Sequence, residues 1–206
     1  MPELYHLLVF FAASMLLALA PGPDNLFVMA QSVQSGRSAG LLVTLGLATG
    51  LVVHTLAVAL GLAALVQASS LAFTVLKFVG AAYLCYLAYR AFRAGKSAGC
   101  EPLAAIRGKL YRRGIIMNIT NPKVSLFFLA FLPQFADPSR GPVVPQLLLL
   151  GMVFILATLL VFGMLSLVAG GAGERLRQSE RAQLVINRIA GGVFAVLAVK
   201  LVLTER

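Results

Sequence analysis

The stretch Pro21-Gly22-Pro23-Asp24-Asn25 interrupts an apolar segment that runs from residue 4 to residue 30. Two prolines and a glycine end a helix there, because proline donates no backbone hydrogen bond and its ring clashes with the preceding turn. A helix that breaks at membrane depth leaves N–H and C=O groups that lipid cannot bond. Such a break is tolerated only where it is buried in protein or lines a wet cavity, and the neighbouring acid indicates a functional site.

The composition supports a membrane setting for this break. The chain has 206 residues, of which 60% are hydrophobic and 12% are charged, and its mean hydropathy is +0.92. Soluble domains are roughly half apolar and one quarter charged, so an all-α integral membrane protein fits best. The net charge of +10 does not indicate nucleic-acid binding, because the basic residues lie in short segments between apolar spans, as membrane topology requires.

Six segments are long enough to cross a bilayer, which takes about 20 helical residues. The first and the fourth contain breaks, so we expect helices 1 and 4 to be broken. The expected spans are Leu4 to Gln31, Ala39 to Gln67, Leu71 to Phe92, Gly114 to Phe135, Val143 to Val168 and Leu184 to Leu203.

The Lys and Arg residues predict the orientation of these spans. Twelve lie in or beside the loops that follow spans one, three and five, whereas two lie on the opposite side. Since basic loops stay in the cytoplasm, both termini are expected outside it. The twelve are Arg37, Arg90, Arg93, Lys96, Arg107, Lys109, Arg112, Arg113, Arg175, Arg177, Arg181 and Arg188, and the two are Arg140 and Arg206; Lys77, Lys123 and Lys200 fall within spans.

The two halves of the chain carry matching features. Pro23-Asp24 in span one corresponds to Pro122-Lys123 in span four, and Lys77-Phe78-Val79-Gly80 in span three corresponds to Arg188-Ile189-Ala190-Gly191 in span six. Three spans per half is an odd number, so the second copy enters the membrane from the other side. We therefore predict a 3+3 inverted repeat, as in many secondary transporters. The repeats are residues 1–93 and 114–206, and residues 94–113 form a basic cytoplasmic linker.

The second break is Asn118-Ile119-Thr120-Asn121-Pro122-Lys123. A residue before proline avoids the helical conformation, so the chain is expected to open at Asn121 and restart with Pro122 at the first helical position. Each restarted helix presents free N–H groups and its positive dipole end near the bilayer midplane. A carboxylate is the natural ligand of such a site, so we expect a small anion or zwitterion as substrate.

Asp24 is the only acid in a predicted span, and Lys123 is the most central base. Their equivalent positions in the two repeats bring them near the pseudo-two-fold axis. One interpretation is a buried pair that fixes the fold. The other, which we favour as a hypothesis, is that Asp24 meets the substrate amino group or a coupling proton while Lys123 meets the carboxylate or neutralises Asp24 between steps.

Polar residues surround both breaks. Asn25, Asn118, Thr120 and Asn121 can bond freed backbone groups or contact the substrate, and cavity-lining residues often do both. His54 in span two is interpreted as a packing residue, with proton coupling as the alternative.

These motifs resemble those of the LysE/RhtB superfamily of amino-acid exporters, in particular its homoserine, threonine and leucine efflux branch. The resemblance rests on Pro21 to Asn25 after an apolar first helix and on Arg113 to Phe135, which contains Asn121-Pro122-Lys123. It implies a bacterial inner-membrane exporter of amino acids that uses the proton gradient and no bound cofactor. Its motif positions fall on Pro21, Gly22, Pro23, Asp24, Asn121, Pro122 and Lys123.

Other functions are less consistent with the residues. A membrane thiol-disulfide conveyor, an enzyme, needs a cysteine at each break, whereas Cys85 and Cys100 lie elsewhere. A cation or metal permease needs several ligands, and the spans hold one acid. A passive channel stays open as an alternative.

The expected partners are a small zwitterion and the lipid bilayer. A second acid for a cationic side chain is missing from the spans, so neutral amino acids are favoured. The Gly46 to Gly50 spacing favours close helix packing within the chain, with a homodimer face as the alternative.

Overall fold

The computed structural model describes residues 3–20, 22–68, 70–93 and 107–169, together with single positions and pairs between 184 and 202. Within these residues the secondary structure is helical, with no strand, which agrees with the predicted all-α class. Most of the sixth predicted span and residues 94–106 of the predicted linker lie outside the described residues. The six-span topology and the inverted repeat therefore remain predictions.

The helices follow the expected spans, and the two breaks bend the chain sharply. The first break bends α1 against α2 by 62°, and the second bends the pair across Ile119 and Pro122 by 51°. Each bent pair can count as one span, beside the single candidate spans Arg37–Gly61 and Val143–Ala169. The elements are α1 (Leu4–Leu19), α2 (Pro23–Ser35), α3 (Arg37–Ala68), α4 (Ser70–Arg93), α5 (Arg107–Ile119), α6 (Pro122–Ala130), the short 3-10 helices η1 (Leu132–Phe135) and η2 (Pro138–Arg140), and α7 (Val143–Ala169).

Two features place α5 differently from the sequence expectation. It begins at Arg107, ahead of the expected start at Gly114, so the basic end of the predicted linker is helical. Only its second half is apolar, because Lys109, Arg112 and Arg113 occupy the first turns. Basic residues at a span end are common, since their charged heads reach the interface.

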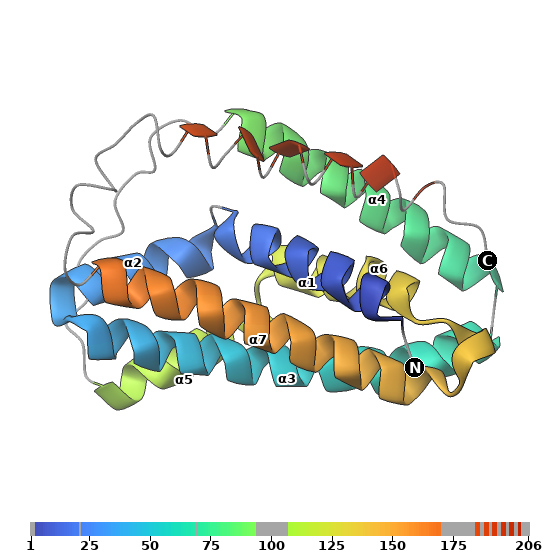
Figure 1. Ribbon diagram of the computed structural model, residues 1–206, viewed down its shortest axis with the longest axis horizontal. Coiled ribbons are helices and arrows are strands. Elements are labelled where there is room, and N and C mark those ends of the chain that lie inside the picture. The colour runs from blue at the N-terminus through green and yellow to red at the C-terminus, as the bar shows by residue number, and fades with distance from the viewer. Residues whose placement is uncertain are drawn as a thin grey trace.

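The long helices lie side by side in a bundle (Figure 1). Helix α3 packs against α5 and α7, α2 packs against α3 and α7, and α1 packs against α7. At the crossing of α3 and α5 the two backbones touch. A Cβ atom on Gly46 would lie 2.2 Å from the carbonyl oxygen of Tyr111, and one on Gly114 would lie 2.5 Å from that of Val43. The glycine spacing in span two thus serves packing within the chain.

Phenylalanines fill the core around the second broken helix. Phe127 of α6 lies with its ring centroid 4.6 Å from that of Phe131 and 5.3 Å from that of Phe154. Phe10 of α1 packs against the same group, with its ring centroid 5.1 Å from that of Phe135. Aromatic pairs at such distances add to the free energy gained by burying the rings. This packing holds α6 between α1 and α7.

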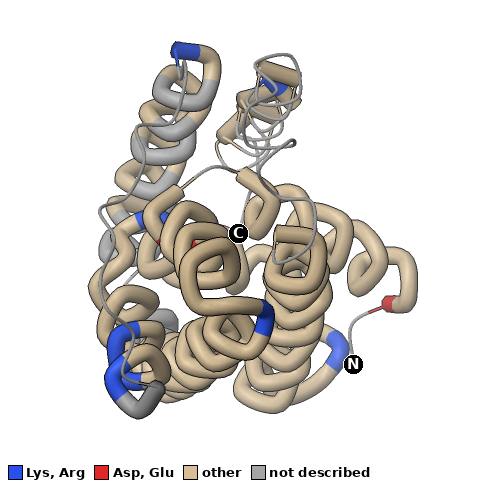
Figure 2. Tube along the Cα trace, turned by 90° about the vertical axis from the view of Figure 1, so that its left-hand side faces the viewer, with Lys and Arg blue, Asp and Glu red and all other residues tan. Residues whose placement is uncertain are grey.

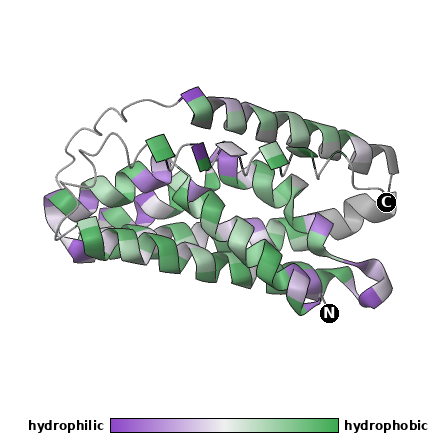
Figure 3. Ribbon diagram, turned by 45° about the horizontal axis from the view of Figure 1, so that its top comes forward, coloured by the Kyte–Doolittle hydropathy of each residue, from purple (hydrophilic) through white to green (hydrophobic). Residues whose placement is uncertain are grey.

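Polar residues gather at the ends of the bundle. The junction of α2 and α3 lies at the same end as the start of α5 (Figure 1). Figure 2 looks onto that end, where several tubes carry Lys or Arg, while the long helices are coloured mostly as hydrophobic in Figure 3. At the other end, Arg140 pairs with Glu3 and Asp137. Bonds from the side chain and backbone of Ser139, together with Arg140, hold the pKa of the Asp137 carboxyl below its ordinary value.

Candidate functional site

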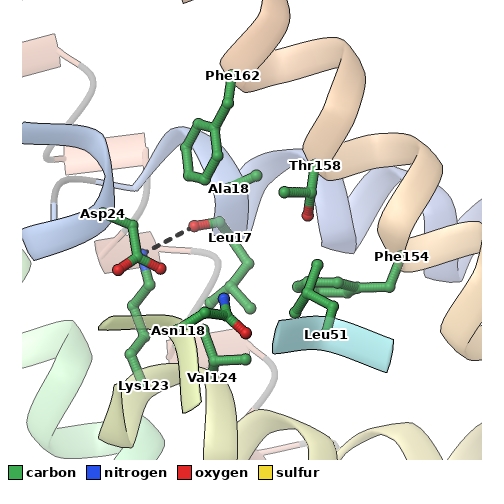
Figure 4. A pocket seen from close by; sticks show the side chains of 10 residues that line it. All are labelled: Leu17, Ala18, Asp24, Leu51, Asn118, Lys123, Val124, Phe154, Thr158 and Phe162. Carbon is green, nitrogen blue, oxygen red and sulfur yellow. Dashed lines mark hydrogen bonds between the residues drawn. The ribbon is translucent and has the colours of Figure 1, made fainter. Parts of the chain in front are cut away.

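A small cavity lies where the two broken helices meet α3 and α7. The cavity has a volume of about 20 Å³. This is enough for a water molecule and far too small for an amino acid. Charged and amide groups stand at one side and aromatic side chains of α7 at the other (Figure 4). The lining residues are Leu17, Ala18, Asp24, Leu51, Asn118, Lys123, Val124, Phe154, Thr158 and Phe162.

The end of α1 receives its hydrogen bonds from other elements. The ammonium of Lys123 donates to the carbonyl oxygens of Leu17, at 3.1 Å, and Ala20, at 2.9 Å. The side-chain amide of Asn25 donates to the carbonyl oxygen of Ala18 at 2.6 Å. Carbonyls in the last helical turn have no partner within the helix, so Lys123 and Asn25 supply what the break removes.

The start of α2 has no side-chain cap. Gly22 is the N-cap residue and offers no side chain, and Pro23 occupies the first turn without an N–H group. Asp24 follows in the same turn and is 3% exposed. Its oxygen Oδ1 is buried and makes no hydrogen bond to any residue that the structure describes. A buried polar atom without a partner is costly, so this oxygen is suited to accept a hydrogen bond from a ligand.

Gly22 also makes room for the ammonium of Lys123. A Cβ atom at Gly22 would lie 3.2 Å from Nζ. A side chain at this position would crowd the ammonium, which would have to shift by a few tenths of an ångström. The sequence motif therefore has a local steric reason.

The second break carries its own cap. Asn121 is extended and is the N-cap residue of α6, its Oδ1 accepts from the backbone N–H of Lys123 at 3.0 Å, and Pro122 is in the first turn. The predicted opening and restart are confirmed. His54 Nε2 lies 3.1 Å from the carbonyl oxygen of Asn118. A carbonyl can only accept, so Nε2 carries the proton and His54 bonds the freed end of α5.

Two amide groups near the cavity have unpartnered atoms. Asn118 Oδ1 and Asn121 Nδ2 are both buried and make no hydrogen bond within the described part of the chain. Asn118 sits close against α3, since a Cβ atom at Gly50 would lie 2.7 Å from its Oδ1. Asn118 lines the cavity together with Asp24 and Lys123. The structure thus brings the predicted acid and base to one cavity.

The other predicted site residues have different positions. Asn25 is buried and bonds α1, and it is not among the cavity-lining residues. Thr120 is exposed, and its hydroxyl donates to the carbonyl oxygen of Ile116 at 2.8 Å. Pro122 is exposed, and Pro21 lies outside the described residues. The cavity therefore gathers Asp24, Asn118 and Lys123, with Asn121 beside them.

Sequence reasoning missed the contributions of α3 and α7. Leu51, Phe154 and Phe162 are ordinary apolar residues within their spans, so nothing in the sequence distinguishes them. Thr158 could have been found as a hydroxyl residue with a phenylalanine four positions away on each side, which places all three on one helix face.

Comparison with known proteins identifies the relatives of this chain. Residues 15–205 match the family model described as LysE type translocator. A homoserine/homoserine lactone efflux protein of Salmonella typhimurium is 38% identical over 154 residues, which are 74% of each chain. An uncharacterized membrane protein of Vibrio cholerae is 31% identical over 194 residues, 93% of this chain and 94% of that protein. No solved structure matches the chain.

These matches confirm the resemblance found in the sequence. The family model extends over both helix breaks, and relatives from several bacteria are named membrane proteins. With its apolar helices, the chain is a multi-pass membrane protein, and its relatives indicate a transporter rather than an enzyme. The chain belongs to the LysE type translocator family.

Proposed function

We propose that this protein exports small neutral amino acids, or close derivatives of them, from the cytoplasm. The observation that carries the proposal is the buried carboxylate of Asp24, which has an unpartnered oxygen and faces a cavity shared with the ammonium of Lys123. The efflux activity named for the Salmonella relative supports the same substrate class. The protein acts in the inner membrane of a bacterium, with both termini outside the cytoplasm.

The chemistry of the cavity suits a zwitterion. Asp24 Oδ1 accepts a hydrogen bond from the substrate ammonium, and such charge-assisted bonds are the strong ones. The substrate carboxylate lies at the uncapped start of α2, where N–H groups and the helix dipole favour an anion, within reach of Lys123. Asp24 is the one acid among the cavity-lining residues. A neutral side chain fits this charge balance better than a cationic one.

Transport requires the cavity to widen. The present space has room for water only. Substrate therefore enters from a conformation in which the two repeats have rocked apart to open the cavity toward the cytoplasm, and it leaves after they open the cavity toward the outside. Asp24 exchanges a proton for the substrate ammonium in each cycle, which couples export to the proton gradient. A carboxylate within a membrane span suits such a relay.

An efflux screen tests the proposal. Cells that carry the protein or an empty vector are loaded with dipeptides of each amino acid, and the extracellular amino acids are compared. We expect faster accumulation of one or more small neutral amino acids in cells with the protein. If no amino acid responds while a metal salt becomes less toxic, the permease alternative replaces the proposal.

Proton coupling has its own measurement. Inside-out vesicles with an imposed pH gradient should accumulate the substrate found in the screen, and an ionophore that collapses the gradient should stop accumulation. Unchanged accumulation after collapse would show that protons do not drive the transport.

A further inference from the structure

One of the six buried hydroxyl groups in the described helices differs from the others in its hydrogen bonding. Five of the six donate to the carbonyl oxygen four residues earlier, at distances of 2.7 to 2.9 Å: Ser14, Ser32, Thr44, Thr55 and Ser166. This bond is the usual partner of a hydroxyl within an apolar helix. The sixth, Thr158, is 3% exposed and does not make this bond within the described residues. Its hydroxyl is therefore available to a group inside the cavity that it lines.

Thr158 stands in the wall of the cavity. It lies on α7, with Phe154 one turn before it and Phe162 one turn after it, and all three line the same space. Figure 4 shows its hydroxyl oxygen pointing into the space that these side chains line. Asp24 and Lys123 lie at the opposite side of this space (Figure 4). The cavity therefore has a charged side and an aromatic side that carries one hydroxyl.

This arrangement separates two tasks of recognition. The charged side suits groups that every amino acid carries, so it does not discriminate between one neutral amino acid and another. The side chain of a zwitterion bound there extends toward α7. A site built to hydrogen-bond a polar side chain rejects the analogue that lacks the polar atom, because the buried group of the site is then left unpaired.

We propose that Thr158 is a specificity-determining residue that hydrogen-bonds an oxygen on the substrate side chain. This inference rests on the proposed function and narrows its substrate class to short side chains that carry a hydroxyl or carbonyl oxygen. Phe154 and Phe162 contact the methylene groups that connect this oxygen to the α-carbon. The hydroxyl can donate or accept, so both alcohols and carbonyl derivatives fit.

The test compares two substrates of equal size. Homoserine ends its side chain in a hydroxyl, and norvaline has a methyl group in that place. Cells with the wild-type protein, T158V, T158S or T55V are loaded with dipeptides of either amino acid, and initial efflux rates are measured above those of vector cells. T55V is the matched control, because Thr55 already bonds the carbonyl oxygen of Leu51 and does not line the cavity.

We expect the wild-type protein to prefer homoserine over norvaline. T158V should reduce this preference by about tenfold through slower homoserine export, since one hydrogen bond is lost. T158S and T55V should keep it. Norvaline export by T158V shows that this variant is folded, and T158A serves in its place if T158V does not accumulate in the membrane.

Three outcomes overturn the inference. A wild-type protein that exports both compounds equally, or a T158V protein with unchanged preference, shows that Thr158 does not read the side chain, while export itself stands. Export of other amino acids but of neither homoserine nor norvaline also overturns the inference and leaves export itself standing. A wild-type protein that exports no amino acid in the wider screen overturns the proposed function as well.

Discussion

The two helix breaks differ in where their hydrogen bonds come from. At the first break, Lys123 bonds the carbonyl oxygens of Leu17 and Ala20, which lie 106 and 103 positions away in the sequence. At the second break, Asn121 caps α6 from its own position, and Thr120 bonds the carbonyl oxygen of Ile116 one turn back. Only His54 reaches the second break from another helix among the bonds described above.

This difference indicates that the first break binds the ligand and the second break mainly supports it. The Asn121 side chain caps the start of α6, so the backbone N–H groups there offer little to a ligand. The start of α2 has no side-chain cap and carries the unpartnered oxygen of Asp24. The second break thus provides the ammonium, the rigid packing and the unpartnered amide atoms of Asn118 and Asn121, and the first break provides the uncapped helix start and the unpartnered carboxylate oxygen. Four variants, from the largest expected effect to the smallest, test this division.

Replacing Asp24 by asparagine should abolish export with little loss of stability. The carboxylate provides the charge-assisted bond to the substrate ammonium, worth up to about 3 kcal/mol, or about 100-fold in rate. Asp24 Oδ1 makes no hydrogen bond to a described residue, so the free energy of unfolding should change by less than about 1 kcal/mol. Efflux rates and thermal unfolding in detergent measure the two effects. Normal export by a protein present at wild-type level would contradict the functional role of the first break.

Replacing Lys123 by methionine should destabilise the protein as well as inactivate it. Two buried carbonyls lose their donor, at about 1–3 kcal/mol each, so we expect a loss of about 2–6 kcal/mol. Thermal unfolding in detergent, compared with that of D24N, measures the difference. Equal stability of K123M and D24N would show that the ammonium does not hold the end of α1.

Replacing Gly46 by alanine should displace α5 from α3. The added Cβ meets a backbone oxygen at 2.2 Å, and backbone cannot move aside as a side chain can. Overpacking of this kind costs about 1–3 kcal/mol. G61A on the same helix is the matched control, since a Cβ there meets nothing within 4 Å. If both variants unfold at the same temperature, the second break does not depend on this contact.

Replacing Asn121 by alanine should have the smallest effect. The variant loses the N-cap bond of α6, worth about 1 kcal/mol, while N121S should retain most of it. Thermal unfolding measures the loss, and export per folded molecule should stay within about twofold of wild type. A loss of export as severe as that of D24N would place Asn121 among the binding residues and weaken the contrast between the breaks.

Local signals explain what could be predicted from the sequence. Proline and glycine at the first break, and an asparagine before proline at the second, act on their own backbone, so both breaks could be placed to the residue. The approach of Asp24 and Lys123 could be anticipated from the correspondence of the two halves. The carbonyl partners of Lys123 could not, because they depend on how α6 packs beside α1. The role of Thr158 likewise depends on which face of α7 lies toward the cavity. The sequence of an almost uniformly apolar helix does not indicate that face.

The long reach of Lys123 also has a consequence for biogenesis. A ribosome completes α1 and α2 about one hundred residues before it adds the lysine that bonds the end of α1. Until then Asn25 is the side chain described here that bonds that end, and the carbonyl oxygens of Leu17 and Ala20 lack their donor. The first half of the protein alone therefore lacks two of the hydrogen bonds at its break. We expect the end of α1 to reach its native hydrogen bonding only when the second half arrives.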